Sequence, residues 1–225
     1  MARGAAAVLA HCAVHGHASP TMREDADELP TTLVVMALEI ESQGLFAARR
    51  VPVLYTGVGK INATLALSRK LAQYRAARRE PPRVLNLGTA GSRHFDRGAL
   101  VECHHFVQRD MDVSALGFAP GHTPFDDIPA RLEFPRSFAE LPAGVCGSGD
   151  SFETGVPRVG CEVIDMEAYA LAKVCKVENL KFACAKYVTD GADHTAADDW
   201  QNNLSAAAAD FWRLYAELDP GALNA

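Results

Sequence analysis

Three acidic residues lie where apolar stretches of the chain end. Glu41 comes shortly after one apolar run, Asp190 directly follows another, and Glu167 lies at the junction between a short apolar run and a helical pattern. Three carboxylates at one rim of a sheet can divide the work of general acid, general base and hydroxyl ligand. Each acid alone is more typical of a helix cap or a solvated side chain. Only their joint position favours catalysis.

The elements that must position these acids alternate along the chain. Apolar runs typical of strands occupy 33–38, 52–56, 83–87, 99–107, 145–146, 162–164 and 182–188, and helical spacing is found at 60–78, 166–177 and 198–218. The glycine-rich segments 88–92 and 147–150 are predicted as turns, and the Pro- and Gly-rich stretch 110–142 as a loop. This alternation predicts a single α/β domain with a central mixed, twisted sheet flanked by helices. Ligands bind at the carboxyl ends of strands in such sheets, which is where the acids lie.

Composition narrows the class of protein. The net charge of −6 argues against nucleic acid as a partner. There is no apolar run long enough for a membrane span, no complete dinucleotide or phosphate loop, and no zinc-type cysteine pair, so we expect neither a membrane association nor a cofactor or metal. The six cysteines predict reduced, buried thiols in a cytoplasmic protein.

The chain is predicted to divide into two parts. Residues 1–30 are expected to be a disordered extension, and residues 31–225 a single domain. The extension faintly resembles a secretory signal peptide, but its apolar run is short and is interrupted by His11 and Cys12.

Six stretches in order carry a more specific signal: MALEIE (36–41), GVGKINA (57–63), NLGTAGS (86–92), SGDSF (148–152), VIDMEAYALAKVC (163–175) and VTDGAD (188–193). Together they resemble the 5′-methylthioadenosine/S-adenosylhomocysteine nucleosidases of the nucleoside phosphorylase superfamily. The resemblance implies a nucleoside phosphorylase-like fold, a homodimer, and hydrolysis of the N-glycosidic bond of an adenine nucleoside by water. It also implies a role in purine and methionine salvage.

The resemblance gives each acid a separate role. Asp190 matches the general acid that protonates adenine, so we expect it to be buried with a raised pKa and oriented by Thr189. Glu41 matches the carboxylate that polarises the attacking water. Glu167 matches the ligand of the ribose hydroxyls, with Met166 beneath the sugar.

The resemblance also implies a set of binding residues. Thr89 and Gly91 match the turn near the water or anion site, Phe152 the ring that stacks on adenine, and Glu153 a backbone contact to the base. The apolar pocket for the 5′ group is expected from Leu38, Val58 and Trp200, and, from a dimer partner, from Val113, Leu116, Phe118 and Pro124.

Several alternatives stay open. Phosphorylases of this superfamily grip phosphate with arginines, whereas the matching places hold Glu39, Glu41 and Asn86-Leu87, which favours water as the nucleophile. The sequence leaves three other functions open: a purine nucleoside phosphorylase, a nucleosidase for AMP or another purine nucleoside, and a non-catalytic nucleoside-binding module. The intervals 41–57, 124–148 and 152–163 are shorter than in the family, which puts the shape of the base and 5′ pockets in doubt.

Overall fold

The computed structural model describes residues 29–151, 157–191 and 196–219, with only the backbone of 196–203. The expected extension over residues 1–30 lies almost wholly outside this part. The strands are β1 (Thr32–Met36), β2 (Val53–Tyr55), β3 (Arg83–Ser92), β4 (Leu100–Gln108), β5 (Arg131–Glu133), β6 (Ala143–Ser148), β7 (Val163–Asp165) and β8 (Phe182–Asp190). The α-helices are α2 (Leu45–Ala48), α3 (Lys60–Ala76), α4 (Ala168–Val177) and α5 (Ala196–Leu218), with 3-10 turns η1 (Glu39–Ser42) and η2 (Ser114–Leu116).

The strands of the described residues form one mixed sheet that closes on itself. Strand β3 pairs with β7, β7 with β6, β6 with β4, β4 with β8, and β8 with β3 again. Strands β1 and β2 continue the sheet from β3, and β5 is added to β4. Parallel and antiparallel pairs both occur, so the predicted mixed sheet is confirmed.

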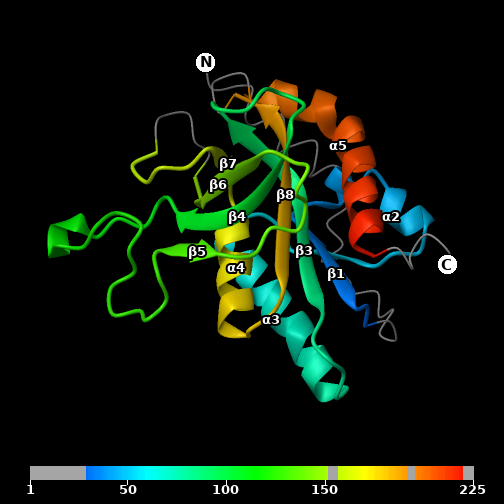
Figure 1. Cartoon of the computed structure of the whole chain (residues 1–225), viewed down its shortest axis with the longest axis horizontal. Helices are drawn as coiled ribbons and strands as arrows, with labels where there is room; N and C mark the ends of the chain where they lie inside the picture. Colours follow the sequence, from blue (N-terminus) through cyan, green and yellow to red (C-terminus); the bar gives the residue numbers. More distant parts are fainter. Residues whose placement is uncertain (1–28, 152–156, 192–195, 220–225) are drawn as a thin grey trace, which may run out of the picture.

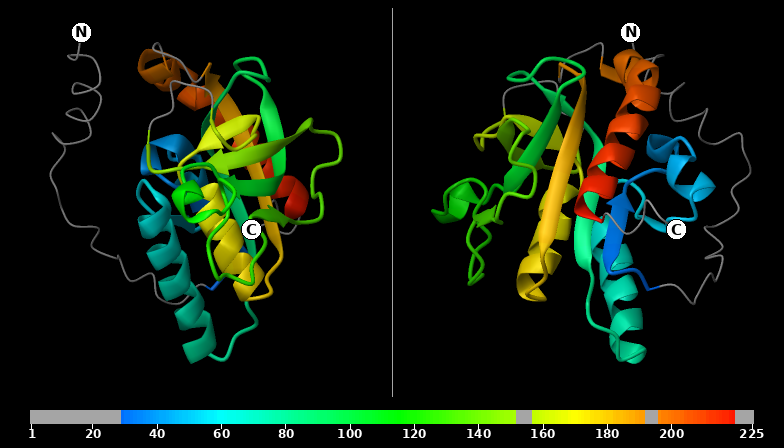
Figure 2. Two further views of the ribbon diagram at one scale, coloured as in Figure 1. Left: turned by 90° about the vertical axis from the view of Figure 1, so that its left-hand side faces the viewer. Right: turned by 45° about the vertical axis from the view of Figure 1, so that its right-hand side comes forward.

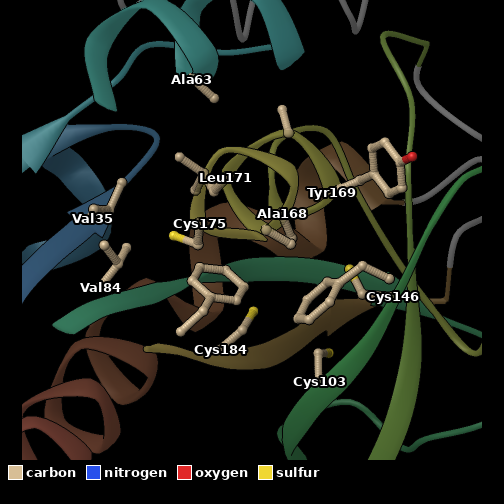
Figure 3. Close-up of a cluster of buried hydrophobic side chains, with 14 of the residues drawn as sticks. Val35, Ala63, Val84, Cys103, Cys146, Ala168, Tyr169, Leu171, Cys175 and Cys184 are labelled. Carbon is tan, nitrogen blue, oxygen red and sulfur yellow. The ribbon is translucent and has the colours of Figure 1, made fainter. Parts of the chain in front are cut away.

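Helices cover the two faces of this sheet. Figures 1 and 2 show α3 and α4 on one side and α5 with α2 on the other. The core beneath α3 and α4 includes Leu67 and Leu71, and also Leu171, which is labelled in Figure 3. The core beneath α5 includes Phe46 and Phe211. The packing of these apolar side chains holds the helices on the sheet, because removing apolar surface from water is favourable.

Five cysteines lie in the described part, and none of them forms a disulfide. Cys103, Cys146 and Cys184 lie close together in the core between the sheet and α4 (Figure 3), and Cys175 belongs to the same core. The expectation of reduced, buried thiols therefore holds for these four.

Three local predictions were wrong. Segment 88–92, expected as a turn, continues β3, because its glycines pair with both β8 and β7 and leave room for neighbouring side chains. Likewise β6 extends through Gly147 to Ser148. The expected loop 110–142 contains the short strand β5, whose pairing with β4 no local pattern indicated.

Within the described residues, no helix has both the length and the apolar character needed to cross a membrane.

Candidate active site

Glu41 is held at the carboxyl end of β1 by three hydrogen bonds. The strand ends at Met36, and η1 turns the chain so that the Glu41 side chain points back at the sheet. Its Oε1 accepts hydrogen bonds from the backbone N–H and the hydroxyl of Thr89, both at 2.8 Å, and its Oε2 accepts one from Leu38 N–H at 3.0 Å. Glu41 is 3% exposed, so this carboxylate is fixed and nearly dry.

A buried ion pair lies next to Glu41. Lys186 Nζ on β8 is 2.8 Å from Asp165 Oδ2, and both side chains are almost fully buried. A Cβ placed on Gly88 would lie 3.3 Å from both Glu41 Oε1 and Lys186 Nζ, so the ammonium and the carboxylate approach the same backbone position on β3. Burial opposes the charge on Lys186, but Asp165 outweighs it and holds the pKa of Lys186 well above its usual value.

Asp165 is in turn fully hydrogen-bonded. Ser148 Oγ donates to its Oδ1, and Ala168 N–H donates to its Oδ2 at 2.8 Å. The Ala168 bond lies in the first turn of α4, where free N–H groups favour a carboxylate. Although burial acts to raise the pKa of Asp165, Lys186 and these donors lower it overall. The ion pair therefore fixes the positive charge of Lys186 and the negative charge of Asp165 next to Glu41.

Glu167 lies at the start of α4, immediately after β7. Its Oε1 accepts a hydrogen bond from Gly59 N–H at 2.8 Å, which ties it to the start of α3. Burial, followed by the nearby charge of Asp165, raises the pKa of Glu167 to about 8, and Glu41 contributes in the same direction. Glu167 and Glu41 are thus close enough for their charges to interact.

Asp190 ends β8 at the same edge of the sheet. It pairs in register with Gly91 of β3, two residues beyond the Thr89 that holds Glu41. Thr189 Oγ1 donates to Asp190 Oδ2 at 3.0 Å, as the predicted orienting role requires. Asp190 is 7% exposed, which agrees with the expected burial, while its raised pKa stays a prediction.

The structure brings Glu41, Glu167, Thr89 and Gly91 to one edge of the sheet together with Asp190. Leu38 and Met166 are half-buried beside Glu41 and Glu167, whereas Val58, just before α3, is 43% exposed. Phe152 and Glu153 lie outside the described residues, and Trp200 is placed only by the backbone of α5.

The residues expected from a dimer partner are set apart from the acids. Val113, Leu116, Phe118 and Pro124 belong to the segment around η2, which projects from the body of the molecule at the edge of Figure 1. Leu116 is 72% exposed, and Phe125 in the same segment is 96% exposed. Within this chain, the side chains of Leu116 and Phe125 are therefore uncovered.

Sequence reasoning missed Lys186 and Arg109. A lysine inside the apolar run 182–188 was a usable signal, because buried lysines need a partner. Arg109, 6% exposed, donates from Nη1 to Ser151 Oγ at 3.1 Å and from Nη2 to the Gly149 carbonyl at 3.3 Å. A Cβ on Gly149 would lie 2.8 Å from the guanidinium carbon, so a larger residue there would displace the Arg109 side chain.

No three His, Cys, Asp or Glu side chains of the described residues gather in a group that could hold a metal ion. The groups that the structure brings to this edge of the sheet are carboxyl groups, the hydroxyls of Thr89 and Thr189, and the ammonium of Lys186.

Comparison with known proteins gives the family and the fold of the chain. A 5′-methylthioadenosine/S-adenosylhomocysteine nucleosidase of Marinomonas sp. is 29% identical over 190 residues, covering 73% of this chain and 78% of its own. The enzyme of the same name from Haemophilus influenzae (strain PittEE) is 26% identical over 198 residues, covering 78% and 83%. The crystal structure of the Helicobacter pylori nucleosidase superposes with a TM-score of 0.71 at 21% identity, covering 84% of this chain and 97% of that one.

The solved structure confirms the predicted fold, and the named relatives agree with the predicted class of enzyme. The roles of the individual site residues stay predictions. The model of the phosphorylase superfamily matches residues 41–218, which include all three acids and most of the chain. The chain therefore belongs to the phosphorylase superfamily.

Proposed function

We propose that this protein hydrolyses the N-glycosidic bond of an adenine nucleoside of the 5′-methylthioadenosine or S-adenosylhomocysteine type and releases adenine. The observation that carries the proposal is the meeting of Glu41, Glu167 and Asp190 at one sheet edge, each held by a different donor. The names of the curated relatives support the same substrate class.

Asp190 is proposed as the general acid. Adenine leaves readily only when it accepts a proton, and burial of a carboxyl group favours the protonated form that can supply it. Thr189 Oγ1 also lies 3.3 Å from the Ala90 carbonyl, to which it can donate instead. The threonine thereby links the orientation of Asp190 to the backbone of β3.

Glu41 is proposed as the carboxylate that polarises the attacking water. The two donors of Thr89 and the N–H of Leu38 hold both of its carboxyl oxygens in place at the end of β1. Lys186 adds a positive charge at the same backbone position of β3.

Glu167 is proposed to bind the ribose hydroxyls. With a pKa of about 8, it carries a proton in much of the ligand-free enzyme at neutral pH. A hydroxyl pair that donates to it favours the carboxylate, so substrate binding is expected to release that proton.

Water is the proposed nucleophile rather than phosphate. The cation next to Glu41 is Lys186, and its charge is already balanced by Asp165 at 2.8 Å. A phosphate dianion at this place would face the carboxyl groups of Glu41 and Glu167, and burial of such a charge is costly.

A homodimer is proposed to complete the 5′ pocket. An apolar groove of about 820 Å³ runs between α3 and α4, lined among others by Ile61, Leu65, Val174 and Val177, and reaches Lys60 and Asp150 near Glu167. The exposed Leu116 and Phe125 of a second copy are suitable occupants. The proposal predicts a dimer in sedimentation, and a Leu116→Asp variant should weaken both dimerisation and turnover.

The absence of disulfides among the described cysteines supports a cytoplasmic location.

The deciding experiment measures free adenine from 5′-methylthioadenosine, S-adenosylhomocysteine and AMP, each with and without phosphate. We expect release from the thio-nucleosides without phosphate. Asp190→Asn should abolish release, whereas the matched Asp210→Asn on α5 should not. A strict need for phosphate would identify a nucleoside phosphorylase instead, and binding without any release would identify a non-catalytic module.

A further inference from the structure

Carboxylates from two distant segments hold the first turn of α3. Gly59, at the N-cap, has no side chain with which to cap the helix. Its N–H donates to Glu167 Oε1 at 2.8 Å, and the next N–H, of Lys60, donates to Asp150 Oδ1 at 2.8 Å. The consecutive N–H groups of Gly59 and Lys60 therefore connect Glu167 with the segment 149–151.

A closed cluster surrounds this turn. Lys60 Nζ lies 2.5 Å from Asp110 Oδ1 and 3.6 Å from Asp150 Oδ2, and Asp150 N–H donates to Asp110 Oδ2 at 2.9 Å. A lysine in the first turn of a helix is disfavoured by the helix dipole, so the two aspartates account for its position. Although burial acts to raise the pKa of Asp110, the bonds from Lys60 and Asp150 lower it overall, so the cluster favours the charged form.

Asp150 lies against the start of α3, where Lys60 N–H, the neighbour of Gly59 N–H, donates to it. Gly59 has a φ of 97°, and a Cβ placed on it would lie 3.1 Å from Asp150 Oδ1. The Lys60 side chain is 13% exposed, which places its charge largely out of water. The position of Asp150 and that of the Gly59 N–H are thus mechanically linked.

We propose that Asp110, Lys60 and Asp150 are positioning residues that fix the first turn of α3, so that Gly59 N–H holds Glu167 in place to bind the sugar. The catalytic part of this inference rests on the proposed function. Removing the ammonium leaves Asp110 and Asp150 facing each other as like charges. Their separation displaces the turn, and Glu167 loses its donor.

The test compares Lys60→Met with Lys60→Arg and with the control Arg75→Met, which removes the exposed Arg75–Glu178 ion pair from the far end of α3. For Lys60→Met we expect KM for 5′-methylthioadenosine to rise about tenfold with little change in kcat. The reason is that Glu167 would lose the Gly59 N–H that holds it in place to bind the sugar, which weakens substrate binding. Lys60→Arg should recover most of this loss, and Arg75→Met should resemble wild type.

The pH profile gives a second readout. Glu167 faces Asp165, Lys186 and Glu41, and the Gly59 N–H is one of the groups that lower its pKa. Loss of that donor should shift the limb of kcat/KM controlled by Glu167 to higher pH in Lys60→Met. A KM increase without this shift would mean that the cluster acts on something other than Glu167, and would overturn the inference.

A third measurement separates this inference from the proposed function. Hydrogen exchange of the Gly59 amide, followed by NMR on the substrate-free full chain, should be slow in wild type and Arg75→Met and at least tenfold faster in Lys60→Met. Unchanged exchange in Lys60→Met overturns the inference even if the enzyme is active. A wild type that releases no adenine contradicts the proposed function alone. If Lys60→Met does not fold, Asp110→Asn serves instead, with faster Gly59 exchange expected and wild-type exchange again overturning the inference.

Discussion

Replacing Lys186 with methionine leaves the Asp165 carboxylate buried without its ammonium partner. Both side chains are nearly inaccessible, at 2% and 1% exposed, so water cannot replace the lost charge. Breaking a buried pair from one side costs about 3–5 kcal/mol. Asp165 keeps its bonds from Ser148 and Ala168, which favours the lower end of that range, about 3 kcal/mol.

The expected effect is large enough for calorimetry. For a chain of this length, about 3 kcal/mol corresponds to a fall in Tm of about 6–12 °C. Lys173→Met is the matched control, because its pair with Asp126 is exposed to solvent and contributes little to stability. The double variant Lys186→Met/Asp165→Asn should recover part of the loss, since the uncompensated charge is gone.

Two results would refute this reasoning. One is a Tm for Lys186→Met within about 2 °C of the Lys173→Met control. The other is a double variant less stable than Lys186→Met alone, which would mean that the Asp165 carboxylate stabilises the fold without its cation.

Three further perturbations test other parts of the structure. The pKa of Glu167 is raised from 4.5 to about 8 in the folded protein, so between these pH values the folded state binds a proton that the unfolded state has lost. The free energy of unfolding should therefore fall as pH rises from 4.5 to about 8. Urea titrations at pH 5, 7 and 9 should show this fall in wild type and not in Glu167→Gln. Gly88→Ala should reduce kcat/KM at least about tenfold, since its Cβ would crowd the Glu41 carboxylate, while Gly160→Ala, with open space around it, should match wild type in the same assay. Phe46→Ala, which removes a fully buried ring from the α5 side, should cost about 3–5 kcal/mol in chemical denaturation but leave KM unchanged below the new Tm.

The alternation of strands and helices was predictable because each element carries its own pattern of apolar residues. The position of Glu41 and Asp190 followed from it, since both lie just at or beyond a strand end. What local patterns miss is pairing between distant segments. The glycines of 88–92 have turn chemistry, yet ladders on both sides of β3 keep them extended.

The buried ion pair shows the same limit within the site. Lys186 is acceptable inside an apolar strand only because Asp165, from a different strand, lies 2.8 Å away. No spacing rule connects the two positions. In the same way, the N–H of Gly59 reaches Glu167 across more than a hundred residues of sequence, so the anchoring of that acid could be found only in three dimensions.

The cysteine cluster of the core gives the protein a chemical reporter of its own unfolding. Contacts with Cys146 and Cys184, together with burial, hold the pKa of Cys103 well above its usual range, and burial raises that of Cys146 to about 12. Because only thiolates react with disulfide reagents or alkylating agents, the thiols of Cys103 and Cys146 should not react in the native fold. On opening of the sheet they become ordinary thiols together, so labelling kinetics would measure how often the core opens, without any engineered probe.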